Sequence, residues 1–204
     1  MPVAGKTRKQ VVTQFREAEI LQAARKVFAQ RGFNDASMDE IAQAASLAKG
    51  TLYLYYPSKL DLYRAALRAG LVDLCDVLEH AIAAAPNLAA RLEAYVGTKV
   101  AYFDEHRDFF RIYLAEFGKA ACGGIDPDFR DLSLRQSRLL QGAIQEAVKS
   151  GEVGKVAAEP AAHAISDLTR GVILRRVMGW STVPKPEKEV AFVVEFAKTA
   201  LGCR

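Results

Sequence analysis

Apolar residues recur at every third or fourth position along most of the chain, which is the spacing of one face of an α-helix. The longest such series is Leu60, Tyr63, Leu67, Leu71, Leu74, Leu78 and Ile82. No stretch bounded by turn residues alternates apolar and polar side chains in the way a half-buried strand would. The pattern therefore predicts an all-α protein.

Capping residues, glycines and prolines divide this pattern into about nine helices. The first has Ile20, Ala24 and Phe28 on its apolar face and ends at Gly32, a residue that adopts the left-handed conformation readily. Ser37 and Glu40 have the spacing of a capping box, which starts a second helix. The remaining predicted helices are 49–56, 59–85, 87–105, 107–121, 127–150, one opened by Pro160 and one opened by Pro186.

Composition places the chain among soluble globular proteins, because 50% of its 204 residues are hydrophobic and 25% are charged. Charged residues interrupt every apolar stretch before it could span a membrane, and the N-terminus has no apolar run typical of a secretory signal. Cys75, Cys122 and Cys203 are far apart, so we expect reduced thiols. These features predict a cytoplasmic protein that does not enter the membrane.

The net charge of +4 is unevenly distributed. Residues 1–64 contain ten Lys and Arg against six Asp and Glu, whereas the other 140 residues contain eighteen of each kind. A basic N-terminal part joined to a neutral part is typical of a protein whose first domain meets a polyanion. Because an excess of four charges also arises by chance, the charge alone leaves both readings open.

Two short helices joined by residues 45–48 have the outline of a helix-turn-helix. The first turns of the second helix carry Lys49, Gly50 and Thr51, which we expect to meet base edges in a major groove. Hydroxyls of Tyr53 and Tyr55, and Lys59 at the start of the next helix, are candidate phosphate ligands. Tyr56 is equally well explained as a packing residue.

Residues 16–63 resemble the DNA-binding domain of the TetR family of transcriptional regulators. The resemblance lies in the runs REAEILQAARKVFAQRGF, SMDEIAQAA and KGTLYLYYPSKLDLY, with gaps between them in the expected places. It implies a three-helix DNA-binding domain with a short basic N-terminal arm at residues 1–60. It further implies an effector-binding and dimerising helical bundle at residues 61–204, and repression that a small molecule relieves.

The predicted DNA-contacting set is Ser37, Lys49, Gly50, Thr51, Tyr53, Leu54, Tyr55 and Lys59. Two positions depart from the family pattern. Ser46 stands in the turn where the family usually has glycine, and Ala48 stands where it usually has a Ser or Thr cap. Loss of that cap is expected to cost the second helix about 1 kcal/mol.

The last predicted helix is apolar on more than one face, which indicates that it packs against two partners. We expect it to pair with the preceding helix and with the same two helices of a second copy, in a four-helix interface. The predicted interface residues are Leu168, Val172, Val190, Val193, Val194 and Ala197. Such a homodimer would present two DNA-contacting helices to a pseudo-palindromic operator.

Aromatic residues gather on the predicted helices 87–105 and 107–121, where most of them must be core. Asp167 and Arg170, three positions apart on a helix expected to be buried, form either an ion pair or a polar contact for a ligand. The predicted effector pocket, for an apolar or aromatic small molecule, comprises Phe103, Phe110, Tyr113, Phe117, His163, Asp167 and Arg170.

The sequence contains no nucleophile elbow, phosphate-binding glycine loop or HExxH motif, so we expect neither a catalytic residue nor a cofactor. Asp104, Glu105, His106 and Asp108 lie close together but are typical of a solvated helix junction rather than a metal site. The sequence thus favours a ligand-responsive regulator that binds double-stranded DNA as a homodimer. A helical adaptor that uses its basic end on acidic partners, and an enzyme built in a helical bundle, remain the alternatives.

Overall fold

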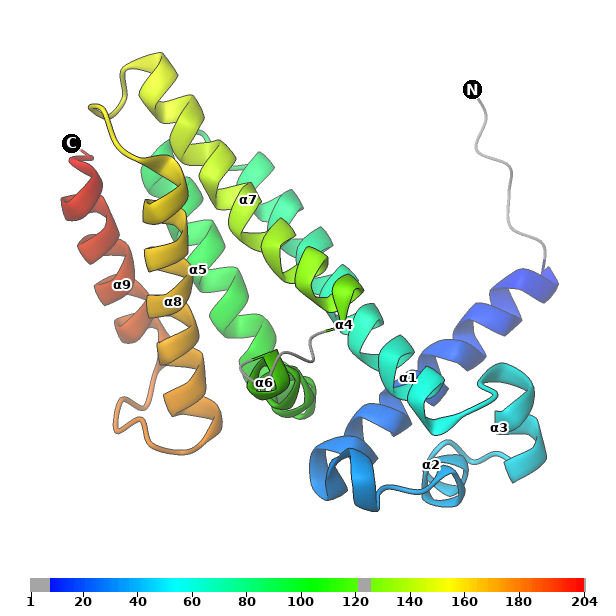
Figure 1. Cartoon of the computed structure of the whole chain (residues 1–204). Helices are drawn as coiled ribbons and strands as arrows, with labels where there is room; N and C mark the ends of the chain where they lie inside the picture. Colours follow the sequence, from blue (N-terminus) through cyan, green and yellow to red (C-terminus); the bar gives the residue numbers. More distant parts are fainter. Residues whose placement is uncertain (1–7, 121–125, 204) are drawn as a thin grey trace.

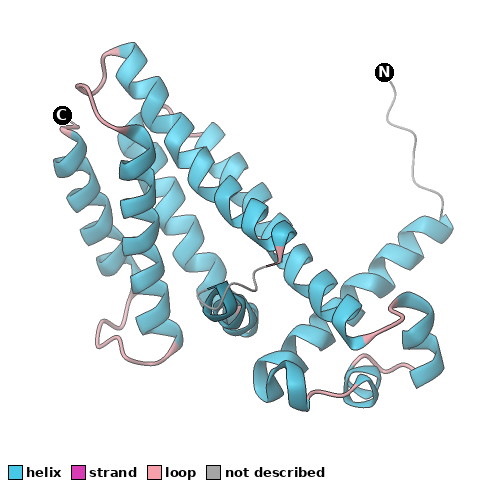
Figure 2. Ribbon diagram, viewed as in Figure 1, coloured by secondary structure: helices cyan, strands magenta, loops and turns pink. Residues whose placement is uncertain are grey.

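The computed structural model describes residues 8–120 and 126–203, and within these ranges the chain forms nine α-helices and no strand (Figures 1 and 2). The all-α prediction is confirmed. The predicted basic arm at residues 1–7, Cys122 and the predicted break at Gly123 lie outside the described residues. The helices are α1 Arg8–Asp35, α2 Met38–Ala44, α3 Lys49–Tyr55, α4 Lys59–Ala83, α5 Leu88–Glu105, α6 Arg107–Ala120, α7 Pro127–Ser150, α8 Ala158–Val177 and α9 Pro186–Leu201.

Local side-chain chemistry sets most of the helix ends. Ser58 caps α4 by accepting from the backbone N–H of Asp61, and Asp126 caps α7 in the same manner. Gly151 ends α7 in the left-handed conformation, with φ 78°. Gly32, with φ 76°, marks a sharp kink where the sequence predicted an end, and α1 continues beyond it to Asp35.

One predicted helix start is wrong. The last long internal helix, α8, begins at Ala158 rather than at Pro160. Pro160 lies in the first turn, where the backbone N–H groups have no helical acceptor and a missing N–H therefore costs nothing. The proline is compatible with a helix that has already begun, so it did not mark the boundary.

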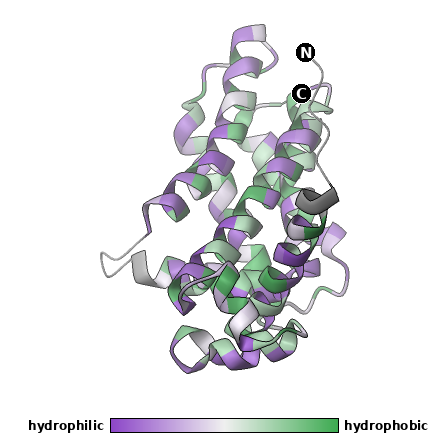
Figure 3. Cartoon of the chain, turned by 90° about the vertical axis from the view of Figure 1, so that its right-hand side faces the viewer, coloured by the Kyte–Doolittle hydropathy of each residue, from purple (hydrophilic) through white to green (hydrophobic). Residues whose placement is uncertain are grey.

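The helices form two groups that share α4 (Figure 1). The first group is α1, α2, α3 and the start of α4, and the second is the rest of α4 packed with α5, α7, α8 and α9. Helix α6 lies between them, in contact with both α1 and α4. Hydrophobic and hydrophilic residues alternate along each helix, as expected of helices with one buried face (Figure 3). The predicted boundary at residue 60 falls in the first turn of α4, so the two groups are joined by a continuous helix.

Helix α4 is closely packed at Gly70. A Cβ atom at this position would lie 2.6 Å from Cδ2 of Phe109 on α6, well inside contact distance. Beside it, the Tyr102 hydroxyl of α5 is 3.1 Å from the carbonyl oxygen of Gly70 and 2.8 Å from the Asp73 carboxylate. Burial and the bond to Asp73 raise the pKa of Tyr102, which keeps this hydroxyl protonated as a donor. Helices α5 and α6 therefore both contact α4 at the turn that contains Gly70 and Asp73.

No helix within the described ranges is both long and apolar enough to cross a membrane. The same residues contain no group of three or more His, Cys, Asp or Glu side chains that could hold a metal ion. Cys75 and Cys203 are free thiols.

We predict that Gly70→Ala lowers the free energy of unfolding by about 1–3 kcal/mol, because the Phe109 ring is buried and cannot give way. The measurement is urea unfolding followed by circular dichroism. Gly142→Ala in α7 is the matched control, since nothing lies within 4 Å of its Cβ position and alanine favours a helix. Equal stability of the two variants would show that the α4–α6 packing is looser than the structure indicates.

Candidate nucleic-acid interface and effector region

Helix α3 is held by one face and exposed on the other. Leu52 is fully buried in the core of the first helical group, while Leu54 is 86% and Tyr53 41% exposed. Gly50 is exposed too, and a Cβ atom there would meet nothing within 4 Å. The exposed face thus combines a backbone open to close approach, an aromatic hydroxyl and an apolar side chain suited to a thymine methyl group.

Lys49 is at the start of α3, as predicted, but its ammonium is not free. It lies 2.8 Å from the carboxylate of Asp39 in the first turn of α2, and both side chains are more than half exposed. The hydrogen bond and charge of Asp39 raise the pKa of Lys49, so the lysine remains charged. A DNA contact by Lys49 has to compete with this ion pair, which solvent screens.

Ser37 and Glu40 form the predicted capping box. The Ser37 oxygen accepts from the Glu40 backbone N–H at 3.1 Å, and the Ser37 backbone N–H donates to the Glu40 carboxylate at 3.0 Å. The Ser37 hydroxyl hydrogen also goes to Glu40, at 2.9 Å. These hydrogen bonds with Ser37 lower the pKa of Glu40. The hydroxyl hydrogen of Ser37 is thus used within the capping box, and a DNA contact by this hydroxyl would have to replace its hydrogen bond to Glu40.

Lys59 connects the start of α4 to the end of α1. Its ammonium donates to the carbonyl oxygens of Asn34 at 2.9 Å and Ala36 at 2.8 Å, and lies 4.8 Å from the centre of the Phe33 ring. One of its three N–H groups remains for a phosphate. Lys59 therefore holds the segment between α1 and α2 in place, a role that sequence reasoning missed because the acceptors are backbone atoms more than twenty residues away.

The tyrosines in and next to α3 differ in how deeply their side chains are buried. Tyr55 and Tyr56 are half-buried and pack against the core, whereas Tyr53 projects outward. Burial and the nearby Glu17 carboxylate raise the pKa of Tyr56. Packing thus accounts for Tyr56, and for much of Tyr55, while Thr51 is partly exposed beside Gly50.

The turn between α2 and α3 has the geometry that the family glycine would suit. Ser46 has φ 55°, the only positive φ of a non-glycine residue among those described. Ala48 is the N-cap of α3, at φ −68° and ψ 142°, and has no side chain able to accept a hydrogen bond from the first turn. Both departures therefore fall at positions where the backbone conformation or the cap costs free energy.

The predicted dimer interface needs correction. Val172, Val193, Val194 and Ala197 are buried within a single chain, where α9 packs against α5 and α8, and Val190 packs on the same core. The apolar side chains that α8 and α9 leave exposed are Leu168 at 41%, Phe192 at 71% and Phe196 at 54%. We call Leu168, Phe192 and Phe196 the α8–α9 face. Periodicity indicated that α9 is apolar on more than one face but did not show which of those faces meets its own chain.

The predicted effector residues lie in two environments. Phe103, Phe110 and Tyr113 are at most 2% exposed and pack against each other, with ring centres 5.0–6.1 Å apart. Phe117 joins them at 4.9 Å from Tyr113. These rings form core in this structure, so a ligand could lie among them only after they separate.

Asp167 is exposed on α8, contrary to the expectation that it lies on a buried helix face with Arg170. His163 is exposed on the same helix. Asp167 pairs with Arg170 at 2.7 Å. The Arg170 guanidinium carbon lies 4.6 Å from the centre of the Phe117 ring, which connects this surface pair to the aromatic core. Of the polar residues proposed for the pocket, only Arg170 therefore touches the aromatic cluster.

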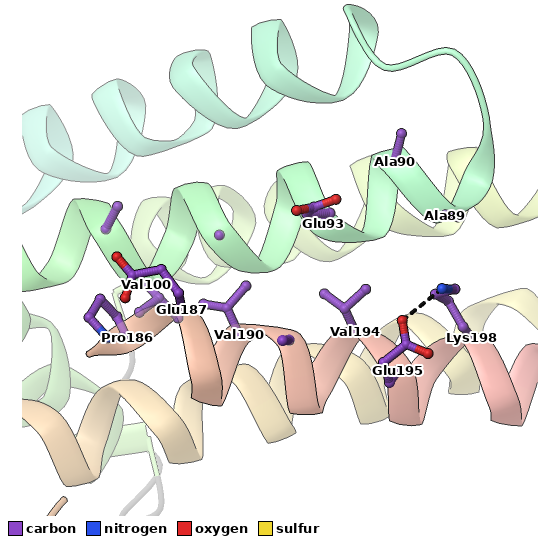
Figure 4. Close-up of a pocket in the computed structure, with 13 residues that line it drawn as sticks. Ala89, Ala90, Glu93, Val100, Pro186, Glu187, Val190, Val194, Glu195 and Lys198 are labelled. Carbon is purple, nitrogen blue, oxygen red and sulfur yellow. Dashed lines mark hydrogen bonds and ion pairs between the residues drawn. The ribbon is translucent and has the colours of Figure 1, made fainter. Parts of the chain in front are cut away.

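A groove between α5 and α9 was not anticipated from the sequence (Figure 4). It has a volume of about 500 Å³ and exists because α5 presents small residues to α9, among them Ala90, Gly97 and Ala101. Val190 and Val194 form its α9 wall, and Glu195 and Lys198 pair at its rim. The small-residue spacing on α5 was a possible signal, but it acquires meaning only once α9 is placed opposite.

Comparison with known proteins identifies the first helical group. Residues 20–66 match the model of the family described as "Bacterial regulatory proteins, tetR family". The chain is 38% identical over 89 residues to the transcriptional activator FasR of Mycolicibacterium smegmatis, an alignment that covers 44% of this chain and 39% of FasR. It is 29% identical over 136 residues to the transcriptional repressor KstR2 of Rhodococcus jostii, covering 67% of each. The chain thus aligns with less than half the length of FasR.

The whole fold also has solved counterparts. The regulator FadR from Bacillus subtilis, crystallised with stearoyl-CoA, superposes with a TM-score of 0.71 over 90% of this chain and 97% of FadR, at 18% identity. At this level of identity the likeness concerns the fold. It extends the resemblance from the first helical group to the arrangement of all the helices.

We predict that Ala48→Ser raises the free energy of unfolding by about 1 kcal/mol, because the serine oxygen can accept a hydrogen bond from the first turn of α3. Ala44→Ser, inside the exposed last turn of α2, is the matched control and is expected to lower stability by about 0.5 kcal/mol. Chemical unfolding of both variants measures the difference. A loss of stability in Ala48→Ser would mean that α3 does not begin at Lys49.

Proposed function

We propose that this chain is a member of the TetR family of bacterial regulatory proteins, and that it is a cytoplasmic, ligand-responsive transcriptional regulator that binds a pseudo-palindromic operator as a homodimer. Residues 1–60 serve as the DNA-binding domain and residues 61–204 as the effector-binding and dimerising domain. The observation that carries the proposal is the exposed face of α3, held from behind by a fully buried Leu52. Its named relatives are regulators, one an activator and another a repressor, and repression is the sign we propose.

Helix α3 suits the major groove in size and surface. Seven residues rise only about 10 Å, so its first turn meets base edges while the later residues reach the backbone. Gly50 and Thr51 are the base-contacting positions, Leu54 contacts a thymine methyl group, and the Tyr53 hydroxyl binds a phosphate. Lys59, with one N–H remaining, adds a second phosphate contact beside the N-terminus of α4.

Dimerisation uses the α8–α9 face. Phe192 and Phe196 lie one helical turn apart on α9, next to a hollow of about 400 Å³ lined by Phe196, Thr199 and Ala200. Around a two-fold axis, each chain inserts its phenylalanines into the hollow of the other. Helices α3 and α9 lie on opposite sides of the molecule (Figure 1), so this arrangement leaves both copies of α3 free for DNA.

The effector acts on DNA binding through α4 and α6. Helix α6 contacts α1 and α4, and Phe109 of α6 packs on Gly70 in the middle of α4. A ligand that separates the C-terminal helices shifts these contacts and changes the spacing of the two α3 helices. Ligand and operator then oppose each other reciprocally. The structural relative FadR was crystallised with stearoyl-CoA, which supports a small-molecule effector in helices of this arrangement.

Selection of bound fragments from random duplex DNA is expected to return an inverted repeat. On that repeat, Thr51→Ala should relax the preference at particular base pairs, by about 1–3 kcal/mol for each lost contact. Tyr53→Phe should weaken binding to all sequences alike, because it removes a phosphate contact and keeps the ring. Fluorescence anisotropy over a salt series measures both effects. Equal, weak binding to every duplex and to heparin would contradict the proposal and favour an adaptor of acidic partners.

The double substitution Phe192→Glu with Phe196→Glu should convert the dimer to a monomer, because four carboxylates would meet in an apolar interface. Sedimentation velocity measures the mass, and affinity for the inverted repeat should fall in parallel. Phe15→Glu is the control, since Phe15 is 66% exposed on α1, outside the α8–α9 face. A double variant that still sediments as a dimer would place the interface elsewhere.

A further inference from the structure

The interior of the C-terminal helices contains polar side chains that the proposed DNA interface and dimer do not use. Lys99 of α5 is 3% exposed and Gln136 of α7 is 1% exposed. Tyr95 of α5 and Ser166 of α8 are also buried. A lysine is almost never buried to this degree unless its charge has a partner. We call Tyr95, Lys99 and Ser166 the interior polar cluster, and Gln136 lies on α7, which packs against α5.

The hydrogen bonds of this cluster form a chain in which each group donates to the next, from Lys99 to the carbonyl oxygen of Ala162. Ser166 donates to the carbonyl oxygen of Ala162 at 2.7 Å, so its oxygen accepts from the Tyr95 hydroxyl at 2.9 Å. The Tyr95 oxygen in turn accepts from the Lys99 ammonium at 3.2 Å. Both hydroxyl hydrogens are therefore used. An ammonium has three N–H groups, and two of those on Lys99 have no acceptor among the residues that the structure describes.

Neither does Lys99 have an opposite charge nearby. Within the described ranges, no carboxylate oxygen lies within 4.0 Å of its ammonium. Its second neighbour is the Tyr95 ring, with the centre 5.3 Å away. A buried ammonium with one neutral hydrogen bond and no counter-ion is unfavourable. The cluster therefore lacks an acceptor that carries negative charge.

Helix α7 brings further donors to the same interior. The side-chain nitrogen of Gln136 and the hydroxyl of Ser133 are buried and have no hydrogen-bond partner. One turn before Gln136, the carbonyl oxygen of Leu132 accepts from the Cys75 thiol of α4 at 3.5 Å. Burial raises the pKa of this thiol to about 11, and the charge of Lys99 acts on it in the opposite direction.

We propose that Lys99, with Gln136, binds the carboxylate of the effector, and that the effector is a free carboxylic acid with an apolar body. This inference rests on the proposed function, which places an effector among the C-terminal helices. A carboxylate offers two acceptor oxygens, which suit the two remaining N–H groups of Lys99 and the amide of Gln136. Leu71 and Leu74 of α4 and Leu140 of α7 are fully buried, so the interior that opens when the ligand separates these helices is apolar and suits the body of the acid.

The depth of the cluster separates a free acid from its coenzyme A ester. In an acyl-CoA the charged groups belong to a large polar moiety that must stay in water, and the thioester carbonyl is neutral. Lys99 and Gln136 are both enclosed by helices, so the charged end of their ligand has to be small enough to be buried with them. The geometry therefore distinguishes this effector from the stearoyl-CoA bound by FadR.

The test is calorimetric titration of the full chain with straight-chain carboxylates from octanoate to palmitate and with 4-phenylbutyrate. The methyl ester and coenzyme A thioester of the tightest binder follow. The acid should bind about ten- to a hundredfold more tightly than its methyl ester, because only the acid forms the charged hydrogen bonds. Lys99→Met should remove this preference, and Gln136→Leu should reduce it. Lys149→Met, at the exposed end of α7, is the matched control and should retain it.

Lys99→Met should be at least as stable as the parent protein without ligand, because it removes a buried charge and keeps the side-chain volume. Gln136→Leu gives an independent reading if Lys99→Met does not fold. Equal affinity for acid and ester, preference retained in Lys99→Met, or no binding by any carboxylate would overturn the inference. Failure of the proposed function is measured separately, by DNA binding: a chain that binds the inverted repeat but no carboxylate contradicts only the inference.

Discussion

The structure depends on how α4 is held, because this single helix belongs to both helical groups. Phe109 of α6 packs directly on Gly70 of α4, at a position where no side chain has room. Tyr102 adds hydrogen bonds to the same turn of α4. Since folded interiors transmit displacement rather than absorb it, a movement of α5 or α6 must move α4 or break this packing. That constraint gives an effector site a physical route to a distant DNA-contacting helix.

The DNA-contacting end is rigid because its own polar groups stabilise it. Ser37 and Glu40 use their hydrogen bonds on each other, and Lys59 gives two of its three to backbone carbonyls. The surface that we propose for DNA is consequently small: Gly50, Thr51, Tyr53 and Leu54, with Lys49 shared with Asp39 and one N–H group of Lys59. Preorganisation of this kind limits the ordering cost of binding, so a short helix suffices as a reader.

In the C-terminal helices, unlike at the DNA-contacting end, some buried polar groups lack hydrogen-bond partners. Most of their interior is closely packed and apolar, yet Lys99 and Gln136 are buried with donors unused. In a protein of marginal stability such groups persist when a function requires them. Among the described residues, the Ser133 hydroxyl, the side-chain nitrogen of Gln136 and Nε of Arg170 are buried without a hydrogen-bond partner, and all three belong to helices of the C-terminal group. A ligand that supplies the missing acceptor has a reason to enter there and the position to influence α4.

The sequence by itself determined the features that depend on residues close together along the chain. The all-helical fold, the capping box, the positive φ of Gly32 and Gly151 and the start of α3 follow from spacings of a few residues and were predicted, whereas the end of α1 and the start of α8 were not. Only the tertiary structure decided which side of each helix is covered. Periodicity cannot tell that Val193 is buried while Phe192 faces solvent, that Asp167 is exposed, or that Lys99 is enclosed. Those outcomes arise from contacts between helices far apart in the chain, and a pattern read along one helix contains no information about its neighbour.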